Sequence, residues 1–305
     1  MRLLNAIFAH LTKHMFLVVL LIISVGGVTY WLLQKPTGTN FLGKKQILLS
    51  YQFELANNSD QLVSSAYFDV FAPLKQSATH QVLDIKTDGE FEVVSDHYGQ
   101  QLIRFKNLTL PPNGARILTV RVLLAVNAVG QGQWPKAIVQ AAREKSRNSW
   151  AGPEVSRLIS ILQHQQQDSL RDISEWLYTH VESVDYMAQD RGAEYALKYK
   201  RGDCTEFMSA FSALAQAAEY PVFGVGGFVV SESSGVLLKA DAYHNWNQAF
   251  ENQSWELFDS QRNLRSAHNT SYVAFRLFGL PETNLKTSSS QRFVVHDERL
   301  TAKMI

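Results

Sequence analysis

The stretch Arg201-Gly202-Asp203-Cys204-Thr205-Glu206 holds the only cysteine of this 305-residue chain. Apolar residues follow it at the spacing of one face of an α-helix, and Pro221 then stops the helix. That apolar stripe consists of Phe207, Phe211, Leu214 and Ala218. A thiol at a helix N-terminus lies at the positive end of the helix dipole, which favours the nucleophilic thiolate. The pattern therefore predicts a reactive cysteine at the first turn of a helix.

Two later segments supply partners for such a nucleophile. Tyr243-His244-Asn245-Trp246 is followed by Trp255-Glu256-Leu257-Phe258-Asp259, and both read as strands. A cysteine, a histidine and an aspartate can act as nucleophile, general base and orienting carboxylate. Strand alternation places His244 and Trp246 on one face, and Trp255, Leu257 and Asp259 on one face. A four-residue loop over 250–253 would place His244 directly opposite Asp259, close enough for a hydrogen bond.

Together these segments resemble the transglutaminase-like superfamily of papain-like cysteine acyl-transfer enzymes, over about residues 168–262. The resemblance rests on Gly202-Asp203-Cys204-Thr205-Glu206, Ala213–Ala218, Pro221 and the glycine-rich 222–227, His244-Asn245-Trp246, Trp255–Asp259 and Gly192-Ala193-Glu194. It implies an α+β domain in which Cys204 forms a thioester, His244 moves the proton and Asp259 orients the imidazole. The fold hosts transferases, proteases, amidases and inactive binders.

The surroundings of the cysteine are less specific. Asp203 and Glu206 are expected to cap the helix, with contact to an incoming amine as the alternative. By analogy with the fold, the Cys204 backbone N–H and an upstream side chain should stabilise the oxyanion. The further oxyanion or substrate candidates are Trp176, Tyr186, Tyr199, Asp203 and Trp246.

Composition excludes several classes of protein. The 29 Lys and Arg residues balance 28 Asp and Glu residues without a basic block, which argues against a nucleic-acid partner. One cysteine cannot form an internal disulfide, and the nine histidines are scattered. His10 and His14 share a helical spacing but read as a solvated flank of an apolar run. The sequence has no clustered acidic loop of the kind that binds calcium. The expected chemistry needs no cofactor or metal.

The apolar run Met15–Leu33 carries no charge over 19 residues, which is close to the ~20 that span a bilayer. Tyr30 and Trp31 stand at its end, where a cleavable signal would have small residues. An uncleaved anchor is favoured over a cleaved signal and over a buried core helix. Arg2 and Lys13 favour a cytoplasmic N-terminus, with the bulk of the chain in the periplasm or outside the cell.

The predicted fold class is α+β: a transmembrane helix, a small antiparallel β-sandwich and a transglutaminase-like domain. Six short β-rich runs lie between 47 and 126, separated by Asn, Asp, Gly and Pro clusters. Helices are expected over 153–165 and 168–182, and strands over 222–230, 242–250 and 254–259. The expected boundaries are 1–34 for the flank and anchor, 35–46 for a linker, 47–130 for the sandwich, 136–281 for the catalytic domain, and 282–305 for a tail with one strand at 293–295.

The sequence thus favours a membrane-anchored, extracytoplasmic cysteine enzyme that acts on amide bonds of a protein or peptide substrate. Acyl transfer to an amine and hydrolysis as a protease or amidase both remain open, as does the oligomeric state. The alternative is a catalytically silent module that binds a peptide in an envelope assembly.

If the run Met15–Leu33 is an anchor that packs against nothing in the core, deletion of residues 1–34 leaves a soluble protein with an unchanged fold. Circular dichroism and a cooperative thermal melt of the truncated chain measure this. Aggregation without a cooperative transition would instead place the run in the core.

Overall fold

The computed structural model describes residues 45–127, 132–146, 152–187, 189–231, 234–266, 269–281 and 289–305. Lys44–Ile305 forms one compact unit, and Met1–Gly43 is the other. The predicted anchor Met15–Leu33 and the flanking His10 and His14 lie outside the described residues. Within the described part, no helix has the length and hydropathy that a bilayer crossing requires.

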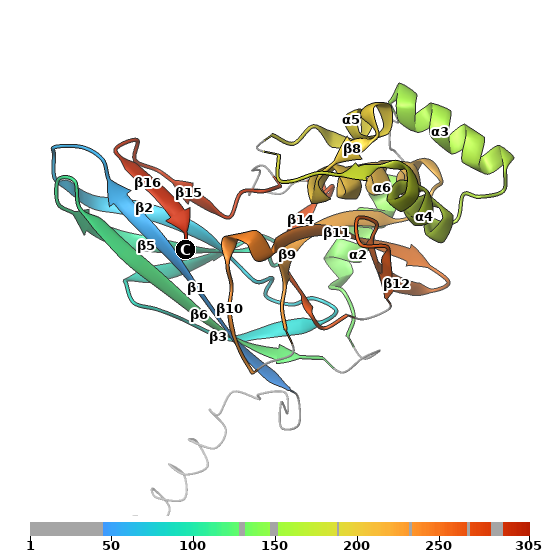
Figure 1. Cartoon of the computed structure of the whole chain (residues 1–305). Coiled ribbons are helices and arrows are strands. Elements are labelled where there is room, and N and C mark those ends of the chain that lie inside the picture. Colours follow the sequence, from blue (N-terminus) through green and yellow to red (C-terminus); the bar gives the residue numbers. More distant parts are fainter. Residues whose placement is uncertain are drawn as a thin grey trace, which may run out of the picture. The chain divides into compact units, whose positions relative to one another are not determined.

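Two largely antiparallel sheets form the predicted sandwich (Figure 1), and all six predicted strands are present. In the first sheet the order is β10-β1-β6-β3, with β16 also paired to β1; in the second it is β15-β2-β5-β4. The six are β1 (Gln46–Asn57), β2 (Val63–Ala72), β3 (His80–Thr87), β4 (Phe91–Ser95), β5 (Gln101–Leu110) and β6 (Ala115–Val126). The additional strands are β10 (Gly235–Leu237), β15 (Phe293–Val295) and β16 (Leu300–Met304).

The sandwich core follows from strand alternation. Every second residue of β1 is buried, and Leu49, Tyr51 and Phe53 point toward the second sheet. The Phe53 ring meets the Phe68 ring of β2 edge-on, with 5.7 Å between their centroids. Burial of each large apolar side chain stabilises the fold by about 1.5–3 kcal/mol, so this shared core holds the two sheets together.

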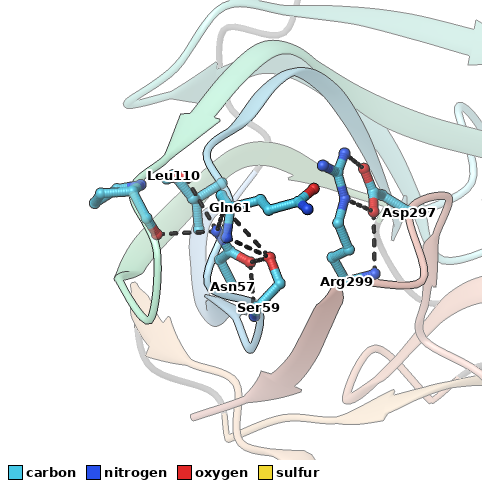
Figure 2. A network of polar contacts seen from close by, with 7 residues as sticks. Asn57, Ser59, Gln61, Leu110, Asp297 and Arg299 are labelled. Carbon is cyan, nitrogen blue, oxygen red and sulfur yellow. Dashed lines mark hydrogen bonds and ion pairs between the residues drawn. The ribbon is translucent and has the colours of Figure 1, made fainter.

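A buried asparagine closes one end of the sandwich (Figure 2). The Asn57 amide donates to the carbonyls of Gln61 at 2.8 Å and of Leu110 at 3.3 Å. Its oxygen accepts from the backbone N–H of Ser59 at 3.0 Å and from the Ser59 hydroxyl at 2.8 Å. One side chain therefore satisfies the polar groups of the β1–β2 turn and ties that turn to β5.

A third sheet, ordered β13-β12-β11-β9-β14, has helices on both faces (Figure 1). Helices α3, α4, α5 and α6 share one core with Val222, Ala249 and Phe258 of the sheet, and α2 packs with Phe223 and Leu257 on the other side. The strands are β9 (Val222–Val229), β11 (Tyr243–Glu251), β12 (Ser254–Asp259), β13 (Leu264–Ser266) and β14 (Tyr272–Phe278). The helices are α2 (Lys136–Ser146), α3 (Pro153–His164), α4 (Leu170–His180), α5 (Gly192–Tyr199) and α6 (Cys204–Ala217).

Helix α6 packs against β9 at a position where the strand has glycine. A Cβ on Gly224 would stand 2.6 Å from the Met208 sulfur, so a side chain at position 224 would displace that of Met208. From β11, the Asn247 amide donates to the Met208 carbonyl at 3.1 Å and to the Ser212 hydroxyl at 2.7 Å. These contacts fix the position of α6 along the sheet, and with it the position of Cys204 at the helix start.

The predicted register of β11 and β12 is wrong by two residues. Phe250 pairs with Trp255 and Asn247 with Phe258, so the connection is the two-residue turn Asn252–Gln253 rather than a four-residue loop. Both turn residues have positive φ, 49° and 66°, as the type I′ turn that joins strands with a right-handed twist requires. A shift of two keeps every side chain on its predicted face, because strands alternate with a period of two.

The C-terminal segment joins both sheets of the sandwich. The predicted strand at 293–295 is confirmed as β15 and pairs with β2, and β16 pairs with β1. From the middle of the chain, β10 pairs in parallel with β1. The division into a sandwich, a catalytic domain and a tail stays a prediction, since Lys44–Ile305 forms one compact unit.

Because β16 pairs with β1, its residue Leu300 should contribute strongly to stability. Leu300 is 4% exposed and part of the sandwich core. We expect Leu300→Ala to lower the free energy of unfolding by about 2–5 kcal/mol, because the cavity it leaves cannot be refilled. Lys303→Ala is the matched control, since Lys303 is exposed and makes an ion pair with Glu54. Urea denaturation of both variants measures the difference; equal midpoints would show that β16 contributes little.

Candidate active site

Helix α6 begins with a capping box that fixes Cys204 as its first residue. The Asp203 carboxylate accepts from the Thr205 N–H at 2.8 Å, and the Glu206 carboxylate accepts from the Asp203 N–H at 3.3 Å. Two N–H groups that the helix cannot satisfy internally are thereby paired. The predicted capping roles of Asp203 and Glu206 are confirmed.

Both carboxylates are also held by a preceding loop. The second Asp203 oxygen accepts from the Met187 N–H at 2.8 Å, and the second Glu206 oxygen accepts from the Arg191 N–H at 2.8 Å. Glu206 is fully buried, and burial raises the pKa of its carboxyl group. Both Asp203 oxygens are therefore occupied by backbone N–H groups, which leaves the contact with an incoming amine without support.

The sequence predicted that the helix start would favour the Cys204 thiolate, but the surroundings of Cys204 in the structure favour the protonated thiol. Burial, and then the Asp203 charge, raise the pKa of the half-buried thiol to about 12. Hydrogen bonds from the Asn245 backbone N–H and the Thr205 hydroxyl act in the opposite direction. The thiol is therefore protonated at neutral pH, and nucleophilic attack requires a base beside it.

His244 lies on β11 and is hydrogen-bonded to Asp259 at the end of β12. The distance from His244 Nε2 to Asp259 Oδ2 is 2.7 Å, and both side chains are buried, 4% and 1% exposed. The predicted His–Asp hydrogen bond is thus present, although Asp259 lies diagonally rather than directly opposite. When Asp259 accepts a hydrogen bond from the Nε2–H of His244, the lone pair of His244 Nδ1 is free to take a proton.

Two further residues hold Asp259. The Tyr272 hydroxyl donates to Asp259 Oδ2 at 2.8 Å, and Arg262 Nε lies 3.8 Å from the same oxygen. Burial, and then the Asp259 charge, raise the pKa of Tyr272, so its hydroxyl stays a donor. The carboxylate is oriented by three partners, as a buried charge requires.

Cys204 and His244 line the same cavity of about 400 Å³, to which the loop before α5 and the C-terminal segment also contribute. Its walls are Val184, Tyr186, Asp203, Cys204, Thr205, Ala240, Asp241, Tyr243, His244, Asn245, Gln261, Arg262, Ser290 and Arg292. Asp259 stands behind His244 rather than in the wall. The cavity brings together a thiol, an imidazole and two guanidinium groups.

Three of the proposed oxyanion or substrate side chains lie outside this wall. Trp176 stacks on His180 at 4.6 Å, with the Lys200 ammonium 4.0 Å from its ring. Tyr199 is 56% exposed beside Tyr195. Trp246 is 2% exposed and packs edge-on against the Tyr272 ring. Of the aromatic candidates, Tyr186 reaches the cavity wall.

Residues that the sequence analysis did not single out complete the site. Tyr272 lies on β14, and Asn245 donates from its amide to the Thr205 hydroxyl at 2.9 Å. The sequence signal for Asn245 was its spacing: Asn245 and Asn247 stand two positions apart in the strand β11, and both are buried. Among the described residues, no group of three or more His, Cys, Asp or Glu side chains could hold a metal ion.

Comparison with known proteins identifies the domain that contains Cys204 and His244. Residues 155–260 match the family model of the transglutaminase-like superfamily. No curated protein matches the chain. A candidate cysteine protease from Cytophaga hutchinsonii has a similar structure, with a TM-score of 0.52 at 12% identity, over 85% of this chain and 90% of that chain.

A second solved structure is the periplasmic domain of TgpA from Pseudomonas aeruginosa bound to ethylmercury. Its TM-score is 0.33 at 14% identity, over 70% of this chain and 90% of that chain. Together with the capped cysteine helix and the His–Asp strand pair, the family match shows that residues 155–260 form a domain of the transglutaminase-like superfamily.

Proposed function

We propose that this protein is a cysteine enzyme that acts on amide bonds of a protein or peptide through a thioester. The hydrogen bond that Asp259 makes with His244, a residue in the wall of the cavity that holds Cys204, carries the proposal. A buried His–Asp pair beside a thiol is the arrangement of a base with its orienting group. The roles of nucleophile, general base and orienting residue follow from it.

In the first step the Cys204 sulfur attacks the carbonyl carbon of the amide, and its proton passes to His244 Nδ1. The carbonyl oxygen becomes negative and is stabilised by the Cys204 backbone N–H at the start of α6, where the helix dipole is positive. Collapse of the tetrahedral intermediate breaks the C–N bond, and the imidazolium returns the proton to the leaving amine. A thioester on Cys204 remains.

In the second step an acceptor attacks the thioester. A primary amine gives a new amide and makes the enzyme a transferase, whereas water gives an acid and makes it a protease or amidase. His244 removes a proton from either acceptor and returns it to the Cys204 sulfur as that leaves. Transfer and hydrolysis both use Cys204, His244 and Asp259. They differ in whether an amine or water attacks the thioester in the cavity.

The raised pKa of the Cys204 thiol supports a second candidate function, a silent domain that binds a peptide in an envelope assembly. Burial and the Asp203 charge both oppose the thiolate. A thiol that no base deprotonates would make the cavity a binding site only. The two functions are separated by whether His244 controls the reactivity of the thiol.

We also propose that the protein is anchored by Met15–Leu33, with its N-terminus in the cytoplasm and Lys44–Ile305 in the periplasm or outside the cell. The uncharged run and the cationic N-terminal flank support this topology. Protease added to spheroplasts tests this topology: a C-terminal tag on the periplasmic side is digested, whereas a cytoplasmic tag is protected.

A protonated thiol that depends on His244 gives a specific pH dependence. In the wild type we expect measurable alkylation of Cys204 by iodoacetamide at pH 7. His244→Ala should lower that rate by roughly a hundredfold, because the general base is lost. Above pH 7 the rate of the variant should rise roughly tenfold per pH unit toward the thiol pKa of about 12, since only thiolate reacts.

The matched control for this measurement is His164→Ala, an exposed histidine at the end of α3. It should leave the alkylation rate unchanged at every pH. Identical rates for His244→Ala and the wild type at pH 7 would favour the silent binding domain.

Substitution of the nucleophile tests catalysis directly. Cys204→Ser keeps the shape of the site but replaces the thiol with a far weaker nucleophile, so activity should fall at least roughly a thousandfold with little change in stability. Asp259→Asn should cost less, because Asn can still hold the imidazole in a less favourable tautomer. Incorporation of a fluorescent primary amine and release of amines from peptides measure transfer and hydrolysis. Undiminished turnover by Cys204→Ser would end the enzyme proposal.

A further inference from the structure

The cavity beside Cys204 contains a cation that the proposed reaction does not use. Arg292 lines the cavity together with the nucleophile, although it is 88 positions further along the chain. It comes from the segment 289–292, directly before β15, outside the residues that match the family model. No step of thioester formation requires a guanidinium at this position.

The segment that carries Arg292 is fixed on both sides. The Ser289 N–H donates to Asp190 at 2.8 Å, and the Ser289 carbonyl accepts from the Tyr243 hydroxyl at 2.8 Å. The Ser289 hydroxyl donates to the Thr205 hydroxyl, next to the nucleophile, at 3.2 Å. After Arg292, β15 pairs with β2 of the sandwich. The guanidinium is therefore held in place rather than free to swing into solvent.

The contacts of Arg292 leave its charge uncompensated within the described residues. One Nη donates to the Ala240 carbonyl at 2.8 Å, and the guanidinium carbon lies 5.6 Å from the centre of the Tyr243 ring. Its Nε is buried, and among the described residues it has no hydrogen-bond acceptor. None of the carboxylates in the described ranges makes an ion pair with Arg292, although a guanidinium offers five donors and stays charged.

The other charged groups of the cavity do not supply the missing anion. Both oxygens of Asp203 accept from backbone N–H groups, and Asp190 accepts from Ser289. Asp241 is exposed at the rim. Arg262, the second arginine of the wall, lies 3.8 Å from Asp259, which His244 already occupies. A half-buried cation without a counter-charge is costly, and an anionic ligand would remove that cost.

We propose that the substrate carries a carboxylate close to the amide that Cys204 attacks, and that Arg292 binds this carboxylate. The planar guanidinium matches a carboxylate with two parallel hydrogen bonds, which fixes orientation as well as position. Arg262 adds positive charge at the mouth of the same cavity. The inference rests on the proposed function, because it names the class of substrate that the site accepts. An acidic side chain and a free chain terminus both provide this chemistry.

The single cysteine allows a test that needs no substrate. Iodoacetate and iodoacetamide alkylate Cys204 by the same chemistry and differ in the negative charge of iodoacetate. We measure the ratio of their rate constants at pH 10, where thiolate forms without His244, so the ratio is measurable whether or not the protein is an enzyme. Slow alkylation at pH 7 would count against the proposed function alone.

Arg292→Gln should lower the iodoacetate-to-iodoacetamide ratio about fivefold, the effect of one unit charge at a few ångströms in water. Arg292→Lys should keep part of the wild-type ratio, since at pH 10 a lysine ammonium, with an ordinary pKa of ~10.4, is partly deprotonated. Arg171→Gln is the matched control: Arg171 is exposed on α4 and paired with Glu175, and its loss should change nothing. An unchanged ratio in Arg292→Gln overturns the proposal.

A measurement on the wild type covers the case in which Arg292→Gln does not fold. Added sodium chloride should lower the ratio, because salt screens the attraction between iodoacetate and Arg292. A ratio no higher than that of free cysteine, and independent of salt, also overturns the proposal.

Small carboxylates then identify the source of the anion. We compare protection of Cys204 from iodoacetamide by N-acetylglutamate α-amide, by N-acetylglycine and by the neutral N-acetylglycine amide. Stronger protection by the first supports an acidic side chain, and stronger protection by the second supports a free chain terminus. Equal protection by all three contradicts a carboxylate subsite.

Discussion

The site depends on the close approach of helix α6 to strands β9 and β11. Gly224 leaves room for Met208, and the Asn247 amide then ties the helix backbone to the sheet. If α6 moved along the sheet by one turn, about 5.4 Å, the start of the helix would leave the end of β11 where His244 lies. Close packing and one buried amide therefore determine which side chain can meet the thiol.

The helix dipole and burial change the pKa of the Cys204 thiol in opposite directions: the dipole lowers it and burial raises it. A helix dipole contributes typically 0.3–1 kcal/mol, which is less than one unit of pKa. Burial and the Asp203 carboxylate are the larger effects here, and the pKa of the thiol rises to about 12. Asp203 caps the helix and also opposes the thiolate, so the residue that orders the site lowers its intrinsic reactivity. In the proposed mechanism, deprotonation of the thiol therefore depends on the His244–Asp259 pair.

Much of the fold could be predicted, because local patterns carry it. The six predicted strands of the sandwich, and the strands that bear His244 and Asp259, follow from alternation, and the capped helix follows from its apolar stripe. The strands β10 and β13 have three residues each, too few to show a period, and β10 finds its partner β1 almost 190 positions away. The predicted β11–β12 register was wrong because Asn252 and Gln253 form a two-residue turn. That turn needs two positive φ angles, which the sequence pattern did not indicate. The sequence could not distinguish Tyr186, which reaches the cavity wall, from the other aromatic candidates, because the direction of a side chain depends on neighbours distant in sequence.

The catalytic candidates and the residues around them differ in where they lie along the chain. The family match ends at residue 260 and includes Cys204, His244 and Asp259. Tyr272, which donates to Asp259, and Ser290 and Arg292, which form part of the cavity, lie beyond it. Because β15 continues from this segment into the sandwich, the sandwich positions one wall of the cavity. The proposed chemistry therefore lies within the transglutaminase-like segment, whereas the proposed carboxylate site draws on residues that the family match does not cover.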